Sequence, residues 1–183
     1  MTLVPEVTLR DAQADDALCI GVLGTQVYLD TYATHGIRSA IAREVQADFG
    51  TAAVAASLAR PDTRFVLAEC AGHLLGFVQL TLGARHALVT GKRTAEVDRL
   101  YVQSRFAGQG LGSRLLHHAE GLALDDGASH LWLTAWVGNR RASAYYARQG
   151  YRDVGSTDHV FEAERFENRV FVRELCGSTA LRA

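Results

Sequence analysis

The stretch that decides the fold is Tyr101-Val102-Gln103-Ser104-Arg105-Phe106-Ala107-Gly108-Gln109-Gly110-Leu111-Gly112-Ser113. An apolar run ends there in a polar, glycine-rich bend, and apolar residues at helical spacing follow the bend as far as Ala123. The stretch therefore predicts a strand, a glycine loop and a helix in direct succession. Such a junction collects free backbone N–H groups and the positive end of a helix dipole, and its glycines let an anion approach closely. We expect a phosphate group to bind there.

Three kinds of phosphate loop compete for this stretch. A P-loop needs Gly-Lys-Ser/Thr, but Gly112 is followed by Ser113 and Arg114, which excludes that class. A dinucleotide fingerprint needs a third glycine where Ser113 stands, and it follows a first strand rather than lying deep in the chain. The spacing from Val102 to Gly112 resembles instead the pyrophosphate loop of the GNAT superfamily, the acyl-CoA-dependent N-acyltransferases. A tight turn with incidental glycines is the alternative.

The composition is that of one soluble globular domain. The chain has 183 residues, of which 48% are hydrophobic and 21% charged, and its net charge is −1. Nothing in this balance favours a nucleic-acid partner, and the sequence has neither a signal-peptide pattern nor an apolar run long enough for a membrane span. The cysteines, Cys19, Cys70 and Cys176, lack metal-ligand spacing and indicate reduced thiols. We therefore expect a cytoplasmic domain over residues 1–176 without a metal, and a flexible tail over 177–183.

Alternation and helical spacing predict seven strands and five helices. The expected strands cover residues 7–10, 65–70, 74–82, 95–102, 130–137, 151–155 and 160–175. The expected helices cover residues 17–32, 37–49, 51–60, 111–125 and 139–149. A helix joins the fourth strand to the fifth, so we expect these two to be parallel, whereas hairpins make their neighbours antiparallel. The sequence thus predicts an α/β (α+β) domain with a mixed, mostly antiparallel sheet and flanking helices.

A second motif is stronger evidence for the same family. The segment from Asn139 to Tyr151 resembles the GNAT signature Asn-x-x-Ala-x-x-Phe/Tyr-Tyr-x-x-x-Gly-Phe/Tyr at every marked position. The hairpin from Phe65 to Leu82 is also similar to the central hairpin of these enzymes. The resemblance spans residues 65–151, and residues 1–60 match only in outline. It implies a seven-stranded GNAT-like sheet in which the central parallel strands splay apart.

In that family acyl-CoA lies between the splayed strands, so the resemblance implies acetyl-CoA as the co-substrate. Its pantetheine arm would pair like a short strand with the free edge formed by Leu100, Tyr101 and Val102. Its pyrophosphate would meet the loop residues Ala107, Gly108, Gln109, Gly110, Leu111, Gly112 and Ser113. The family usually carries Arg or Gln at the position of Ala107. We therefore expect weaker binding of CoA unless Gln109, Arg105 or Arg114 compensates.

Asn139 and Tyr146 belong to the second motif. Asn139 should form a hydrogen bond near the splay or cap its helix, and the two roles are compatible. The family places the tyrosine that matches Tyr146 against the sulphur of acyl-CoA, which makes it the candidate acid and part of the cofactor site. Tyrosine ordinarily has a higher pKa than a thiol, so a hydrogen bond to the developing thiolate is easier than early proton transfer. The alternative is a core tyrosine, a role that Tyr145 fills better.

Acylation of an amine requires the amine to be neutral, so a base is useful. Glu96 lies six residues before Val102, where some family members carry a catalytic glutamate. Asp98 shares the face of Glu96 in a regular strand, and it is the second candidate for the base and a candidate substrate ligand. Either carboxylate could instead only bind a substrate cation or a neighbouring arginine.

The acceptor site is expected on the variable parts of the fold. These are the helix around Tyr28 and Tyr32, the loop 83–94 and the segment 157–166. The two tyrosines lie one helical turn apart and either enclose the substrate or belong to the core.

The resemblance implies an N-acetyltransferase that acts on a primary amine of a small molecule, such as a polyamine, an amino acid or an aminated antibiotic. The alternatives are an acetyltransferase of protein N-termini or lysines, a non-catalytic acyl-CoA-binding module and an NAD-binding oxidoreductase. The expected partners are acetyl-CoA and the amine, without nucleic acid or membrane, and a homodimer is left open.

Overall fold

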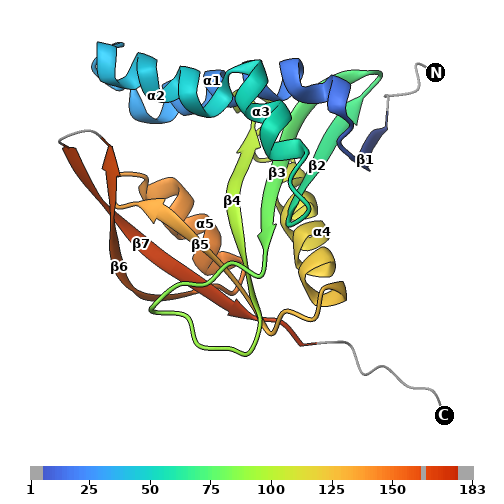
Figure 1. Ribbon diagram of the computed structural model, residues 1–183, viewed down its shortest axis with the longest axis vertical. Coiled ribbons are helices and arrows are strands. Elements are labelled where there is room, and N and C mark those ends of the chain that lie inside the picture. Colours follow the sequence, from blue (N-terminus) through green and yellow to red (C-terminus); the bar gives the residue numbers. More distant parts are fainter. Residues whose placement is uncertain (1–5, 162–163, 177–183) are drawn as a thin grey trace.

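The computed structural model of the protein describes residues 6–161 and 164–176, and the tail expected at 177–183 lies outside them. The strands form one sheet in the order β1-β2-β3-β4-β5-β7-β6 (Figure 1). They are β1 Val7–Asp11, β2 Thr63–Cys70, β3 His73–Leu82, β4 Thr94–Val102, β5 His130–Trp136, β6 Arg152–Phe161 and β7 Glu164–Glu174. Strands β4 and β5 are parallel, and the other neighbours are antiparallel. The predicted mixed, mostly antiparallel sheet of seven strands is confirmed.

Helices cover both faces of this sheet (Figure 1). They are α1 Ala17–Tyr32, α2 Ser39–Phe49, α3 Thr51–Leu58, α4 Leu111–Asp125 and α5 Arg140–Arg148, with short 3-10 turns at Ala14–Asp16 and Ser104–Phe106. One core lies under α4 and α5, where Leu115 and Leu116 pack with Leu131 and Leu133 of β5. The other core lies under α1 and α3, against phenylalanines of β2 and β3. No helix in the described part of the chain is long and apolar enough to cross a membrane.

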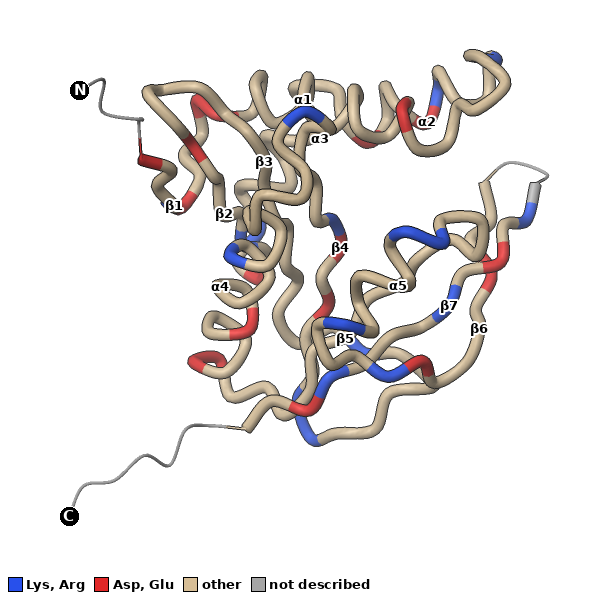
Figure 2. Tube along the Cα trace, turned by 180° about the vertical axis from the view of Figure 1, so that it is seen from behind, with Lys and Arg blue, Asp and Glu red and all other residues tan. Residues whose placement is uncertain are grey.

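Charged residues of both signs occur in both halves of the molecule. Lys and Arg positions lie among Asp and Glu positions around β1 to β4 as well as around β5 to β7 (Figure 2). This mixture agrees with the net charge of −1. Any charge preference of a binding site must therefore come from its own local residues.

Strand β4 contains a β-bulge beside β3. Gln79 pairs with Arg99 and Leu80 pairs with Val97, so Asp98 is an extra residue on β4. Because of this extra residue, the odd- and even-numbered residues of β4 swap the side of the sheet that they face. Before the bulge the odd-numbered residues face the core under α4, and after it the even-numbered residues do. The opposite face, toward α1 and α2, therefore collects Glu96, Asp98, Arg99 and Tyr101.

Strand β6 is longer than the sequence predicted. The expected end at Gly155 is wrong, and β6 runs on to Phe161, with Val160 paired to Arg165 of β7. The reason is that Gly155 lies at another β-bulge, with a φ of 143°, and the strand continues through it. A glycine inside an alternating pattern can mark a bulge as well as a strand end.

The segment between β3 and β4 is a loop, as the sequence predicted, and most of its residues are exposed. Its half-buried residues Ala84 and Val89 pack against a small cluster formed by Trp132, Val170 and Val172. The segment therefore covers one face of β5 and β7. Its role is to complete the core at that face.

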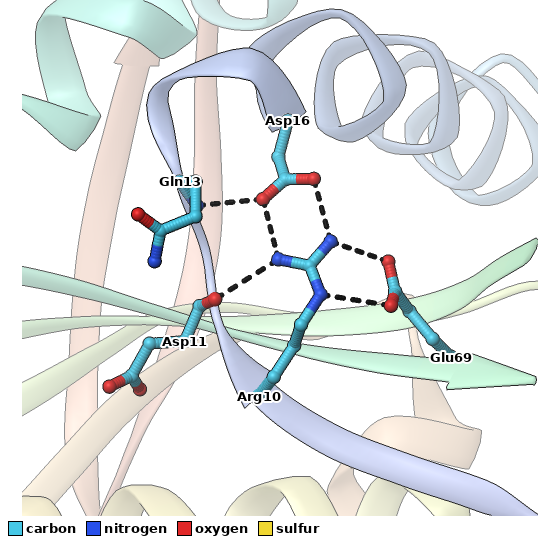
Figure 3. A network of polar contacts seen from close by, with 5 residues as sticks. All are labelled: Arg10, Asp11, Gln13, Asp16 and Glu69. Atoms are coloured by element: carbon cyan, nitrogen blue, oxygen red, sulfur yellow. Dashed lines mark hydrogen bonds and ion pairs between the residues drawn. The ribbon is translucent and has the colours of Figure 1, made fainter. Parts of the chain in front are cut away.

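Arg10 links the first strand to the start of α1 (Figure 3). Its guanidinium donates two hydrogen bonds to Glu69 of β2, at 2.9 and 2.6 Å, and two to Asp16, at 2.7 and 2.8 Å. Another goes to the backbone carbonyl of Asp11, and Asp16 also accepts the backbone N–H of Gln13. The hydrogen bonds from Arg10 are the main cause that lowers the pKa of Asp16. This network fixes where the chain turns from β1 into α1.

Replacing Arg10 by Met is expected to lower the free energy of unfolding by about 1–2 kcal/mol, because the bonds are charge-assisted but partly exposed to solvent. The pKa of Asp16 is lowered in the folded state, so its contribution is complete above the unfolded-state pKa of about 3.9 and is lost as the pH falls further. Urea titrations should therefore show a larger difference between the two proteins at pH 7 than below pH 3. Arg60→Met, which removes an exposed pair with Asp62, is the control. Equal losses for both variants would contradict the assignment.

Candidate active site

The parallel strands β4 and β5 separate after a short paired region. Their pairing runs from Thr94 with His130 to Glu96 with Trp132. Beyond these positions β4 continues to Val102 beside β3 alone, and the two strands diverge (Figure 1). The predicted splay is thus present, and the edge of β4 that faces β5 offers backbone groups with which an extended ligand can pair. This edge includes the predicted cofactor-binding residues Leu100, Tyr101 and Val102.

The glycine loop connects β4 to α4 and is open toward solvent. Gly108 and Gly110 have φ angles of +79° and +82°, in the left-handed region that other residues rarely adopt. A Cβ on either glycine would meet no atom within 4 Å. Gly110 is the N-cap of α4, and no side chain caps the helix, so the N–H groups of its first turn are available to an anion. The cradle is built from the predicted residues Ala107, Gly108, Gln109, Gly110, Leu111, Gly112 and Ser113.

Three polar side chains were candidates to replace the contact that Ala107 lacks. The amide of Gln109 folds back and donates to the carbonyl of Arg105 at 3.3 Å. The guanidinium of Arg114 donates to the carbonyl of Val7 in β1 at 2.8 Å. The side chain of Arg105 is exposed and has no ion pair with another described residue. Arg105 is therefore the cation of this loop that is available to a phosphate.

Asn139 caps helix α5. Its side-chain oxygen accepts a hydrogen bond from the backbone N–H of Ala142 at 3.1 Å. The cap is one of the two roles that the sequence offered for this residue. Its contact with a cofactor near the splay stays a prediction.

Tyr146 is buried in the core between α5 and the sheet. Its ring packs against Tyr151 and Phe171, with centroids 6.1 and 5.8 Å apart. Burial raises its pKa, and the neighbouring Tyr145 and Tyr32 add to the shift, so the phenol is protonated at neutral pH. Its hydroxyl forms no hydrogen bond with another residue in the described ranges. The side chain can therefore be part of the core and still donate a hydrogen bond to a ligand.

Glu96 and Asp98 lie on the face of β4 opposite α4. The pKa of Glu96 is raised to about 8, mainly by burial and also by the negative charge of Asp98, while Arg99 opposes the shift. Asp98 is exposed on one side and accepts a hydrogen bond from the hydroxyl of Thr81 at 2.8 Å. The protein atoms around Asp98 still displace enough water to raise its pKa, against the effects of Thr81 and Arg99. Both carboxyl groups therefore hold protons more strongly than usual.

A cavity of about 210 Å³ opens on this face of the sheet, below α1 and α2. Its lining comes from α1, the α1–α2 connection, α2, β4, β5, β6 and β7: Tyr28, Tyr32, Arg38, Ala40, Ile41, Glu44, Asp48, Asp98, Arg99, Tyr101, Thr134, Trp136, His159, Phe161, Phe166 and Asn168. The cavity brings together the three predicted substrate ligands, Tyr28, Tyr32 and Asp98. The predicted segment 157–166 contributes to it, whereas the loop 83–94 does not. Glu96 is not part of its lining and lies beside Asp98 at the base of the splay.

The comparison with protein families decides the class of this site. Residues 29–151 match the model of the acetyltransferase (GNAT) family. This chain belongs to the GNAT acetyltransferase family. The matched region includes the glycine loop, the splayed strands and the signature in α5, so the family assignment rests on the elements that form the site.

Relatives of this acetyltransferase support the assignment. An uncharacterized N-acetyltransferase of Mycobacterium tuberculosis is 30% identical over 135 residues, which are 74% of this chain and 82% of the relative. The thialysine N-epsilon-acetyltransferase of Bos taurus is 34% identical over 87 residues, which are 46% of this chain and 49% of the relative. The crystal structure of the PaiA N-acetyltransferase of Thermoplasma acidophilum, in complex with coenzyme A, has a TM-score of 0.71 at 18% identity. That likeness covers 92% of this chain and 99% of the other, and it concerns the fold.

The cavity of this acetyltransferase is also lined by charged residues that the sequence did not reveal. Glu44 and Asp48 of α2 lie one helical turn apart, and Glu44 is only 7% exposed. Arg99 donates to Asp48 at 2.7 Å and to Gln79 at 2.6 Å, and it lies over the ring of Phe49. The sequence did contain one signal for Glu44. It lies among the buried positions of an amphipathic helix, where a carboxylate needs a partner or a function. The bulge that turns Arg99 inward has no such signal in the sequence.

Proposed function

We propose that this acetyltransferase transfers the acetyl group of acetyl-CoA to the primary amine of a compact small molecule. The observation that carries the proposal is the cavity beside the splay, which combines aromatic walls with the carboxylates of Glu44 and Asp98. A protonated amine is attracted to such a surface. The cavity is smaller than the usual 300–1,000 Å³ of sites for drug-sized ligands, which favours a compact acceptor. The bovine relative, named for a small amine of the lysine type, supports the same class of substrate.

Two features of the site fit CoA, the glycine loop and the free edge of β4. The open glycine cradle and the uncapped start of α4 suit a pyrophosphate. The free edge of β4 suits the amides of the pantetheine arm, which would meet Leu100, Tyr101 and Val102. When bound, acetyl-CoA supplies an acetyl thioester whose carbonyl can be attacked by an amine.

The side chains around the splay can then take distinct roles. Glu96 accepts the proton of the substrate ammonium, directly or through water, because a carboxyl group with a pKa of about 8 can exchange protons near neutral pH. Asp98 holds the cationic acceptor at the wall of the cavity. A backbone N–H of β4 near Leu100 or Val102 donates to the carbonyl oxygen as it gains charge. The hydroxyl of Tyr146 donates a hydrogen bond to the sulphur as it leaves.

Thermal unfolding with ligands tests the proposal. A ligand that binds only the folded state raises the melting temperature with its concentration. Acetyl-CoA and CoA should both raise it, and NADH at the same concentrations should not. No rise with either CoA species would refute the proposal, and a rise with NADH alone would point to an oxidoreductase. A panel of primary amines, read out by the release of free thiol, then identifies the acceptor class.

Arg105→Ala is expected to weaken the binding of CoA by about tenfold, because a charge-assisted hydrogen bond to phosphate is lost. Ala107→Arg should strengthen binding by a similar factor, since it restores the side chain that the family usually carries there. Isothermal titration calorimetry with CoA measures both changes. Arg114→Lys is a control on the neighbouring helix that retains the charge. The role of Arg105 is wrong if its replacement leaves the dissociation constant unchanged.

A further inference from the structure

We propose that the acceptor carries a second cationic group in addition to the reacting amine, and that Glu44 recognises this group. The inference rests on the proposed function, because it concerns the acceptor cavity of the same site. It identifies the substrate class as a short diamine or a similar compact dication. It also makes Glu44 a specificity-determining residue rather than part of the acetyl-transfer step.

Glu44 is a buried carboxylate at the wall of a cavity. It is 7% exposed, and its Oε1 accepts a hydrogen bond from Nε2 of His159 at 3.0 Å. Tyr28 lines the same cavity beside Glu44, and burial and Glu44 raise the pKa of its phenol, so this neighbour is neutral. A carboxylate has about four acceptor positions. The hydrogen bond with His159 therefore leaves Glu44 with capacity for a donor from a ligand.

The walls around Glu44 suit a cation. Tyr28 and Tyr32 lie with their ring centroids 4.6 Å apart, and the next ring, Trp136, is 5.9 Å from Tyr32. Two phenylalanines, Phe161 of β6 and Phe166 of β7, line the same cavity. Aromatic faces attract ammonium groups, most strongly where water is excluded. A carboxylate among aromatic rings therefore favours a positively charged alkyl group over a neutral one.

The other two acidic residues of the cavity differ from Glu44 in their pairing or their position. Asp48 is paired with Arg99 at 2.7 Å, so its charge is balanced within the protein. Asp98 lies on β4, next to the splay where the acetyl group would be transferred. Glu44 lies on α2, on a different wall. Arg38 marks the outer end of the cavity, because it also lines a second pocket with the exposed Ile37.

These positions assign one carboxylate to each end of a dication. The reacting amine would lie near Asp98 and Glu96, and the second ammonium would lie between Glu44 and the aromatic rings. The structure also permits a simpler role for Glu44, since its contact with His159 joins α2 to β6. The experiment must therefore separate the recognition of charge from the support of the fold.

The probes are 1-aminobutane, 1,4-diaminobutane and 4-aminobutanoate, which share a four-carbon chain and differ in the charge of the far end. With acetyl-CoA in excess, kcat/KM for the diamine should exceed that for the monoamine by about tenfold or more, as expected for a contact between charged groups. The amino acid should be the poorest of the three. Equal values for the diamine and the monoamine, or a preference for the amino acid through Arg38, would overturn the proposal. Acetylation of none of the three would instead count against the proposed function itself.

Glu44→Gln tests the residue. The amide oxygen can still accept the hydrogen bond from His159, so a role in joining α2 to β6 is largely preserved. We expect kcat/KM to fall more for 1,4-diaminobutane than for 1-aminobutane, so that the preference for the diamine falls to about threefold or less. An equal loss for both amines would show that Glu44 only supports the fold. Asp30→Asn, which removes an exposed charge from α1 outside the cavity, is the matched control and should retain the full preference.

Discussion

Replacing Glu96 by Gln is expected to lower kcat/KM for amine acetylation by about 100-fold at pH 8, because a general base contributes at least this factor. Burial raises the pKa of Glu96 to about 8 in the folded protein. The ionised form, which accepts the proton, therefore increases as the pH rises through about 8. The wild-type rate should rise over the same range, whereas the rate of the variant should follow only the ionisation of the amine. Initial rates between pH 6 and pH 10 at saturating acetyl-CoA measure both effects.

Asp98→Asn distinguishes the two carboxylates. Asp98 also has a raised pKa, but it lines the cavity, whereas Glu96 lies at the base of the splay. We expect the Asp98 variant to raise KM for the amine and to retain the pH profile. If the rate of Asp98→Asn followed only the ionisation of the amine while Glu96→Gln kept the wild-type pH profile, the base would be Asp98. Unchanged rates in Glu96→Gln at every pH would remove Glu96 from the mechanism.

The raised pKa of Glu96 also makes the stability of the protein depend on pH. At pH 4 Glu96 is protonated in both the folded and the unfolded state. Between pH 4.5 and about 8 the unfolded chain releases this proton while the folded protein holds it, so the stability of the wild type falls as the pH rises. Glu96→Gln lacks this loss and should become more stable than the wild type toward pH 9. Urea titrations at pH 4 and pH 9 detect the difference without relying on activity.

Tyr146→Phe is expected to lower kcat by about 10- to 100-fold with little change in KM for the amine, because a hydrogen bond to the developing thiolate exists only in the transition state. The phenol is protonated at neutral pH, since burial raises its pKa. Phenylalanine retains the packing against Tyr151 and Phe171, so the fold should be unaffected. Thioesters of more acidic thiols need less help at the sulphur, and the loss should be smaller with them.

Tyr145→Phe is the matched control on the same helix. The Tyr145 hydroxyl is buried and has no hydrogen-bond partner among the described residues, and Ser113 stands near it without the geometry of a hydrogen bond. Its removal should leave kcat unchanged and should stabilise the fold slightly, since an unpaired buried hydroxyl is unfavourable. Equal losses of kcat in both variants would place the effect of Tyr146 in packing rather than in proton donation.

Much of the fold was predictable because its signals are local. The glycine loop between β4 and α4, the cap at Asn139 and the order of strands and helices each follow from spacing within a short stretch. The splay followed from the resemblance of two motifs to one family. These features depend on neighbours in sequence, which a single chain displays directly.

The acceptor cavity was less predictable because distant segments meet there. Glu44 and His159 are 115 residues apart in the sequence, and only the packing of α2 beside β6 brings them together. The bulge at Asp98 has no glycine to mark it, yet it turns Arg99 and Tyr101 toward the same cavity. A bulge depends on the register with the partner strand, and one strand alone does not reveal that register.

The most direct test of the proposed function follows both products of one reaction. The protein is incubated with acetyl-CoA and 1,4-diaminobutane, and free thiol and acetylated amine are measured in the same samples by colorimetry and mass spectrometry. We predict that the two products form in equal amounts and that Glu96→Gln slows both together. Thiol release without an acetylated amine, across this and other primary amines, would contradict the proposal that this protein is an amine acetyltransferase acting on small molecules.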